Sequence, residues 1–199
     1  MKEIISQSLN NAMSYNEFKT VVFDLLQEGK STGENQSDTL LNYSLLSDKR
    51  MKRLDKKIII NNDVKNIVSK IDKNITFLVL MESWCGDGAQ TLPVINKIAK
   101  LSPNIKFKVV LRDENETLMN AFLTNGNKSI PKVIIFEDAN YQVLNSWGPR
   151  PSQATKMVND FKMKHGKLNA EFKKDLQIWY NKDKGKSTQD DFIAILKSI

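Results

Sequence analysis

The opening quarter of the chain carries apolar residues at the spacing of amphipathic helices. Two such segments, residues 14–28 and residues 38–54, are separated by the polar stretch 30–37. Ser14, followed three positions later by Glu17, fits a capping box at the start of the first segment. The second segment carries the apolar residues Leu40, Leu41, Leu45, Leu46 and Met51. The pattern predicts a helical hairpin.

From residue 58 onward, short apolar runs alternate with helical segments. The expected strands are residues 58–60, 75–81, 105–111, 132–136 and 142–147. The expected helices are residues 63–71, 89–101, 114–123, 152–164, 167–179 and 188–199. The run 75–81 is continuously apolar, as in a strand covered on both faces. The alternation predicts an α/β fold, with a mixed central sheet flanked by helices on both faces.

The chemistry of the chain centres on its single cysteine, Cys85, in the sequence Trp84-Cys85-Gly86-Asp87-Gly88. This sequence follows an expected strand and opens an expected helix. A helix N-terminus presents unpaired N–H groups that favour a thiolate, so the position predicts an accessible, nucleophilic thiol with a lowered pKa. The carboxylate of Asp87 would oppose that effect, or would instead cap the helix through its first N–H groups.

The segment MESWCGDGAQTLPVINKIA resembles the strand, the Trp-Cys-Gly loop and the active-site helix of the thioredoxin superfamily, with Pro93 where that helix is kinked. Ser129-Ile130-Pro131, 46 positions beyond Cys85, resembles the segment around its cis-proline. With SIPKVIIF and SWGPRP, the chain looks like a bacterial branch that carries an N-terminal helical extension. The resemblance covers residues 58–148 and implies a thioredoxin-like fold.

The expected organisation is therefore an N-terminal helical extension over residues 1–57, a thioredoxin-like domain over residues 58–165 and a C-terminal helical tail over residues 166–199. The sequence does not indicate whether the helical hairpin covers the site or forms a dimer.

The resemblance also implies roles for individual residues. Cys85 would attack, Trp84 would shield one side of its sulfur, and Gly86 and Gly88 would let the chain turn closely. The backbone of Ile130, before Pro131, would pair with an extended substrate segment.

Two departures from the family pattern change the chemistry. The second cysteine of thioredoxins is replaced by Gly88, and their buried acid by Val79. A mixed disulfide would therefore have to be resolved by an external thiol.

Two charged residues near this motif leave alternatives open. Arg150 in Gly148-Pro149-Arg150-Pro151 is a surface or helix-capping arginine, or it contacts the carboxylate of an anionic thiol. Glu82 is a solvent-facing residue at the end of a strand, or a proton acceptor near the thiol.

Composition narrows the class of protein. The formal charge of +7 comes from basic residues scattered along the chain without interleaved aromatics, which argues against nucleic-acid binding. One cysteine and one histidine leave no ligand set for zinc, and we expect no metal and no cofactor. No apolar run is long enough to span a bilayer, and the first residues do not resemble a secretory signal, so we expect a cytoplasmic protein without membrane contacts.

Three functions remain open. The first is monothiol thiol-disulfide exchange or adduct formation at Cys85, with a protein or a low-molecular-weight thiol or disulfide as partner. The second is a non-catalytic thioredoxin-fold module that binds a protein through the groove around Trp84, Ile130 and Pro131. The third is a peroxidase that uses Cys85. The sequence supports this hypothesis less, because it lacks a Thr-x-x-Cys environment with a supporting arginine.

Overall fold

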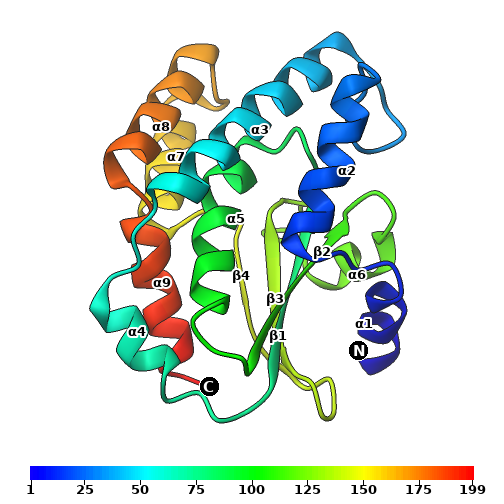
Figure 1. Ribbon diagram of the computed structural model, residues 1–199. Coiled ribbons are helices and arrows are strands. Elements are labelled where there is room, and N and C mark those ends of the chain that lie inside the picture. The colour runs from blue at the N-terminus through cyan, green and yellow to red at the C-terminus, as the bar shows by residue number, and fades with distance from the viewer.

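A computed structural model describes all 199 residues as nine helices and four strands (Figure 1). The elements, in chain order, are α1 (Lys2–Leu9), α2 (Tyr15–Gln27), α3 (Asp38–Lys57), α4 (Asn62–Val68), β1 (Ile75–Met81), α5 (Gly86–Ala99), β2 (Ile105–Leu111), α6 (Glu116–Ala121), β3 (Lys132–Glu137), β4 (Val143–Trp147), α7 (Ser152–His165), α8 (Ala170–Asp183) and α9 (Lys186–Leu196). The strands form one mixed sheet in the order β2-β1-β3-β4. The predicted α/β architecture is confirmed.

Strand β1 is the centre of the sheet, and every one of its residues is buried. It runs parallel to β2 in a register that begins at Ile75 and Ile105, and antiparallel to β3. The continuous apolar run in the sequence reflects this position, because a strand with helices over both faces has no solvent side. The limits of β1 and β2 are those that the sequence predicts.

The predicted strand at residues 58–60 is wrong. The segment is extended, with Ile58 and Ile60 buried and Ile59 83% exposed, but it joins no sheet. Side chains satisfy its backbone instead: Lys97 donates to the carbonyl of Ile58 at 2.7 Å, and Gln189 donates to that of Ile59 at 3.3 Å.

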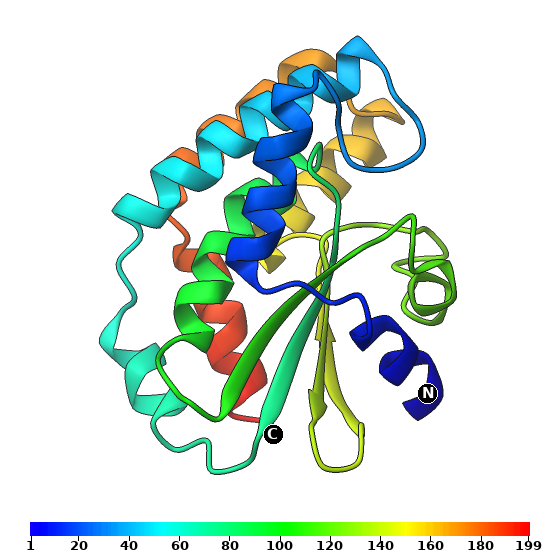
Figure 2. The ribbon, with the colours of Figure 1, turned by 45° about the vertical axis from the view of Figure 1, so that its right-hand side comes forward.

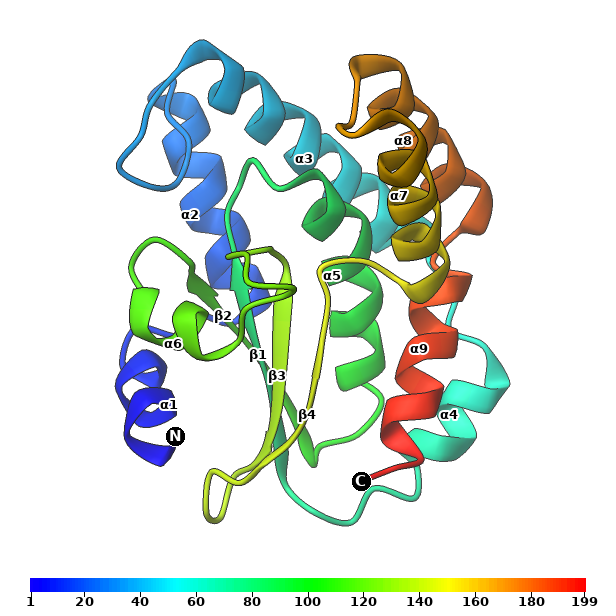
Figure 3. The same ribbon diagram turned by 180° about the vertical axis from the view of Figure 1, so that it is seen from behind.

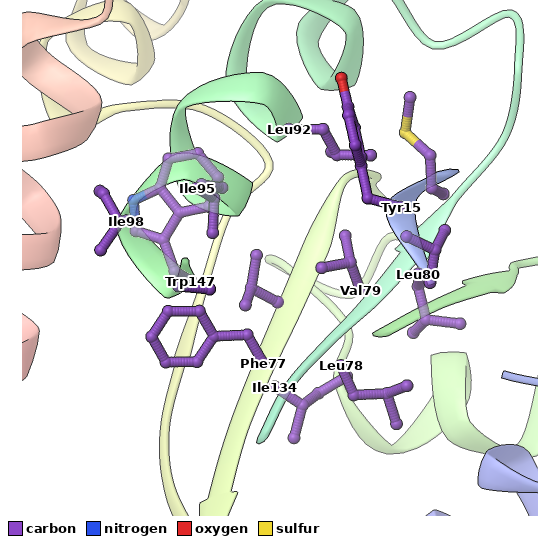
Figure 4. Close-up of a cluster of buried hydrophobic side chains, with 14 of the residues drawn as sticks. Tyr15, Phe77, Leu78, Val79, Leu80, Leu92, Ile95, Ile98, Ile134 and Trp147 are labelled. Carbon is purple, nitrogen blue, oxygen red and sulfur yellow. The ribbon is translucent and has the colours of Figure 1, made fainter. Parts of the chain in front are cut away.

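Helices cover both faces of the sheet (Figure 2), with α1 and α6 on one side and α5 and α9 on the other. Phe77 of β1 and Trp147 of β4 lie beside Ile95 and Ile98 of α5 (Figure 4). The ring of Phe192 in α9 lies within 5.6 Å, centroid to centroid, of both aromatic rings. The end of the chain therefore contributes directly to the main core.

The helical hairpin α2–α3 forms as predicted, and both members of the Ser14–Glu17 capping box are present. Of the five apolar residues singled out in its second helix, only Met51 is fully buried. Leu45 and Leu46 are exposed, while Ser44 and Ser47 are fully buried. The Ser44 hydroxyl lies 2.7 Å from that of Ser83, so a polar contact with the segment after β1 sets the rotation of α3.

Helices α7 and α8 have a small hydrophobic core of their own, formed by Ala154, Val158, Phe172, Leu176 and Tyr180. Figure 3 shows this pair and α3 rising at the same end of the molecule, where β1 leads into α5. No helix of the protein is both long and apolar enough to cross a bilayer.

Candidate functional site

The candidate site lies in the short connection between β1 and α5. Cys85 is the N-cap of α5, and its sulfur accepts a hydrogen bond from the backbone N–H of Gly88 at 3.3 Å. The thiol donates to the carbonyl of Ile130, also at 3.3 Å. The Ile130–Pro131 peptide bond is cis. Two motifs 46 positions apart in sequence are thus in direct contact.

Cys85 is not the accessible, acidic thiol that its position predicts. Its side chain is buried, with the residue only 7% exposed. Burial, followed by the carboxylate of Asp87, raises the pKa of the Cys85 thiol to about 12. The N–H of Gly88 and the charge of Arg150 act in the opposite direction but do not outweigh desolvation. The thiol is therefore protonated at neutral pH, and a thiol is a far weaker nucleophile than a thiolate.

Asp87 links the loop between β1 and α5 to the C-terminal part of the chain. Its carboxylate forms an ion pair with Arg150 at 2.7 Å and accepts a hydrogen bond from the hydroxyl of Tyr180 at 2.9 Å. Burial raises the pKa of Asp87, while the charge of Arg150 and the bond from Tyr180 lower it. Arg150 thus contacts a carboxylate of this chain, and Cys85, rather than Asp87, occupies the N-cap position of α5.

The two glycines of the motif have different surroundings. A Cβ at Gly86 would lie 3.4 Å from the guanidinium of Arg50 in α3 and 3.6 Å from the amide of Gln177 in α8. A Cβ at Gly88 would overlap the sulfur of Met81, which is fully buried. Side chains of α3 and α8 therefore border Gly86, and Met81 fills the space that a side chain at position 88 would need.

Trp84, Ile130 and Pro131 do not form an open groove. The guanidinium of Arg112 stacks over the Trp84 ring, 4.9 Å from its centroid. Ile130 and Pro131 are both buried, and the carbonyl of Ile130 already accepts from the thiol. One of the two lone pairs on the carbonyl that the sequence assigns to a substrate is thus used within the protein.

Glu82 is fully buried, so a solvent-facing position is wrong. One carboxylate oxygen accepts from the hydroxyl of Thr32, and the other accepts from the backbone N–H of Asp113 at 3.0 Å. Thr32 also donates its backbone N–H to Ser83 at 3.0 Å. These bonds fasten the loop between α2 and α3 onto the segment that precedes Cys85.

Sequence reasoning missed the residues that α3, α8 and the loop before α3 bring to the site, namely Thr32, Ser44, Arg50, Gln177 and Tyr180. None lies near the motif in sequence. The only signal was the serine pair of α3, at positions where an amphipathic helix would bury apolar residues. No group of three or more His, Cys, Asp or Glu side chains is placed to hold a metal ion.

The buried carboxyl of Glu82 predicts a pH-dependent stability. Burial raises its pKa above the ordinary 4.5, so the folded protein retains this proton to a higher pH than the unfolded chain does. Glu82 therefore costs stability increasingly as pH rises from about 4.5 through its raised pKa. Urea unfolding of wild type and Glu82→Gln should show that the advantage of the variant grows over this interval and then levels off. An advantage that is constant from about pH 4 to about pH 9 would contradict the assignment.

The mixed sheet, the cysteine at the N-cap of α5 and the facing Ile130–Pro131 segment define a thioredoxin-like protein. In agreement with this class, the sequence profile of the family described as thioredoxin matches residues 33–162. The chain belongs to the thioredoxin family.

Two solved structures share the fold over almost their full length. One is an HIV epitope scaffold, with a TM-score of 0.59 and 16% identity, covering 94% of this chain and 99% of that chain. The other is a protein of unknown function from Pseudomonas aeruginosa, with a TM-score of 0.57 and 18% identity, covering 93% of this chain and 98% of that chain. Among curated proteins, none matches this sequence.

Proposed function

We propose that this protein is a non-catalytic thioredoxin-fold module that binds a partner protein. The observation that carries the proposal is the state of Cys85, a buried thiol whose pKa is raised to about 12. Nucleophilic cysteines need an electropositive and partly exposed environment, whereas buried structural cysteines are inert. Cys85 is in the buried environment of an inert, structural cysteine.

The surroundings of the thiol support the same conclusion. Met81 occupies the place where a resolving cysteine would stand, so the loop is packed for glycine at position 88. The hydrogen bond from the thiol to Ile130 uses a backbone acceptor that a bound substrate strand would need. The role of Cys85 in this arrangement is to connect the start of α5 to the segment before β3.

The helices packed beside the loop argue against an exposed redox site. The hydroxyl of Tyr180 holds Asp87 from α8, and the amides of Gln177 and Gln90 lie 2.9 Å apart. On the other side, α3 contacts Ser83. A redox site that acts on many substrates must be accessible to them. Here, the protein's own helices border the loop that carries Cys85.

Monothiol exchange through Cys85 is the second candidate, because the Gly88 N–H and the charge of Arg150 both favour a thiolate. In that reaction the Cys85 thiolate attacks a disulfide, forms a mixed disulfide and releases one thiolate. A second thiolate, from an external thiol, then displaces Cys85 and restores it. This candidate requires the loop to open, since the sulfur is buried.

An exchange assay separates the two candidates. Wild type and Cys85→Ser are incubated with glutathione and bis(2-hydroxyethyl) disulfide, and exchange is followed together with the intact mass of the protein. If the protein is a non-catalytic module, wild type and Cys85→Ser should give equal rates of exchange. Wild type should then form a mixed disulfide only after unfolding in urea. Faster exchange by wild type, with a reversible adduct of native protein, would establish the monothiol function instead.

A further inference from the structure

Within the first half of α3, two serines are buried while three apolar residues are exposed. Ser44 and Ser47 are fully buried, whereas Tyr43, Leu45 and Leu46 are 44%, 38% and 46% exposed. A surface helix of a soluble protein normally shows the opposite arrangement. Tyr43 and Leu46, three positions apart, are neighbours on the helix surface.

Helix α2 extends this surface with one more aromatic side chain. Phe23 is 47% exposed, and the ammonium of Lys52 lies 5.4 Å from the centre of its ring. Lys52 follows Leu45 by two helical turns, so Phe23 and Leu45 border the same side of α3. We call Phe23, Tyr43, Leu45 and Leu46 the α2–α3 patch.

The rest of α3 is strongly basic. Its basic residues are Lys49, Arg50, Lys52, Arg53, Lys56 and Lys57. Its two later acids are already paired, Asp48 with Lys52 at 2.7 Å and Asp55 with Lys19 of α2.

Three lysines of α3, Lys49, Lys56 and Lys57, are exposed and have no acidic partner. The helix therefore exposes three apolar side chains at positions 43–46 and, beyond them, lysines with uncompensated positive charge.

We propose that the α2–α3 patch is the docking surface for an acidic amphipathic segment of a partner protein. The inference rests on the proposed binding function. Apolar side chains of that segment would cover the patch, and its carboxylates would meet Lys49, Lys56 and Lys57. Ser44, on the buried side of α3, contacts Ser83, two positions before Cys85, so the patch and the loop that carries Cys85 lie on different sides of the helix.

Charge and pattern disfavour two other occupants. A second copy of the chain, with its formal charge of +7, would oppose one basic helix to another. A helix that lies on a membrane carries an apolar stripe along its length. In α3 the exposed apolar residues are confined to positions 43–46.

Binding of defined probes tests the proposal. The first probe is a fluorescent amphipathic peptide of leucine and glutamate, about four helical turns long, and the second replaces each glutamate with lysine. The third is a vesicle containing about 30% phosphatidylserine. We expect the glutamate peptide to bind about tenfold more tightly than the lysine peptide, and more weakly as salt increases.

Matched variants locate the surface. Leu45→Ser/Leu46→Ser should weaken binding of the glutamate peptide about tenfold. Leu101→Ser, which changes a side chain that is 40% exposed at the other end of α5, should leave affinity within about twofold. Circular dichroism confirms that each variant remains folded.

Three outcomes overturn the docking surface. The first is that the protein binds both peptides equally well or binds neither. The second is binding to the vesicles, and the third is self-association that Leu45→Ser/Leu46→Ser abolishes. Repeating the titration with Cys85→Ser separates this inference from the function on which it rests. If that variant does not bind, or if wild type catalyses exchange, the non-catalytic module is wrong. If exchange is absent and no peptide discriminates, only the docking surface is wrong.

Discussion

At about pH 7, native protein should react with iodoacetamide about a thousandfold more slowly than an ordinary cysteine does. The pKa of Cys85 rises from its usual 9.0 to about 12, chiefly through burial. Each pKa unit removes about nine tenths of the remaining thiolate, which is the reactive form. The rate should therefore keep increasing with pH, without a plateau below about pH 10. Mass spectrometry measures the extent of alkylation, and the added mass can be assigned to Cys85 because the chain has a single cysteine.

The variant Asp87→Asn tests how the charge of Asp87 contributes to the raised pKa of the Cys85 thiol. The substitution keeps the shape of the side chain but removes the charge that raises the pKa of Cys85, so alkylation should become faster. Asp113→Asn is the matched control, because Asp113 pairs with Arg112 and does not contribute to the pKa of Cys85. A wild-type rate that follows the pKa of a free cysteine, about 8.5, would show that the thiol is accessible and ionises normally.

Strand β1 could be predicted from the sequence because burial on both faces leaves a direct signature, a continuous apolar run. The limits of β2 follow from alternating apolar residues and lysines that end in an apolar run. Helix α1 was missed because it carries few apolar residues, although Ile5 is fully buried. A single buried side chain in a short helix leaves no periodicity to detect.

The rotation of α3 could not be predicted for a different reason. Apolar residues at helical spacing indicate a helix but not which of its sides faces the core when both sides carry leucines. The hydroxyl contact between Ser44 and Ser83, made 39 positions apart, decides that question in the folded chain.

At the candidate site, the sequence predicts the position of the cysteine but not the ionisation state of its thiol. The sequence motif locates Cys85 at the start of α5, as the structure has it. Whether the thiol ionises depends on burial and on Asp87, whose carboxylate is held by Tyr180 from 93 positions away. Such long-range partners leave no spacing pattern, so a local motif predicts a reactive thiol where the fold produces a protonated one.

Gly88→Ala should lower the free energy of unfolding by about 1–3 kcal/mol, because a methyl group there overlaps the buried sulfur of Met81. Urea unfolding measures the change. Gly86→Ala is the matched control, since its Cβ meets only Arg50 and Gln177 at ordinary contact distances. Alanine has the higher helix propensity at both positions, so the difference between the two variants isolates the overlap.

The Met81→Val background completes the test. Valine is shorter than methionine and vacates the space that the new methyl group needs. Gly88→Ala should therefore cost less in this background, a non-additivity expected only of residues in contact. Equal costs in the two backgrounds, or no difference between Gly88→Ala and Gly86→Ala, would mean that position 88 tolerates a side chain. The loop would then have kept room for a second cysteine, and the absence of one would not reflect its packing.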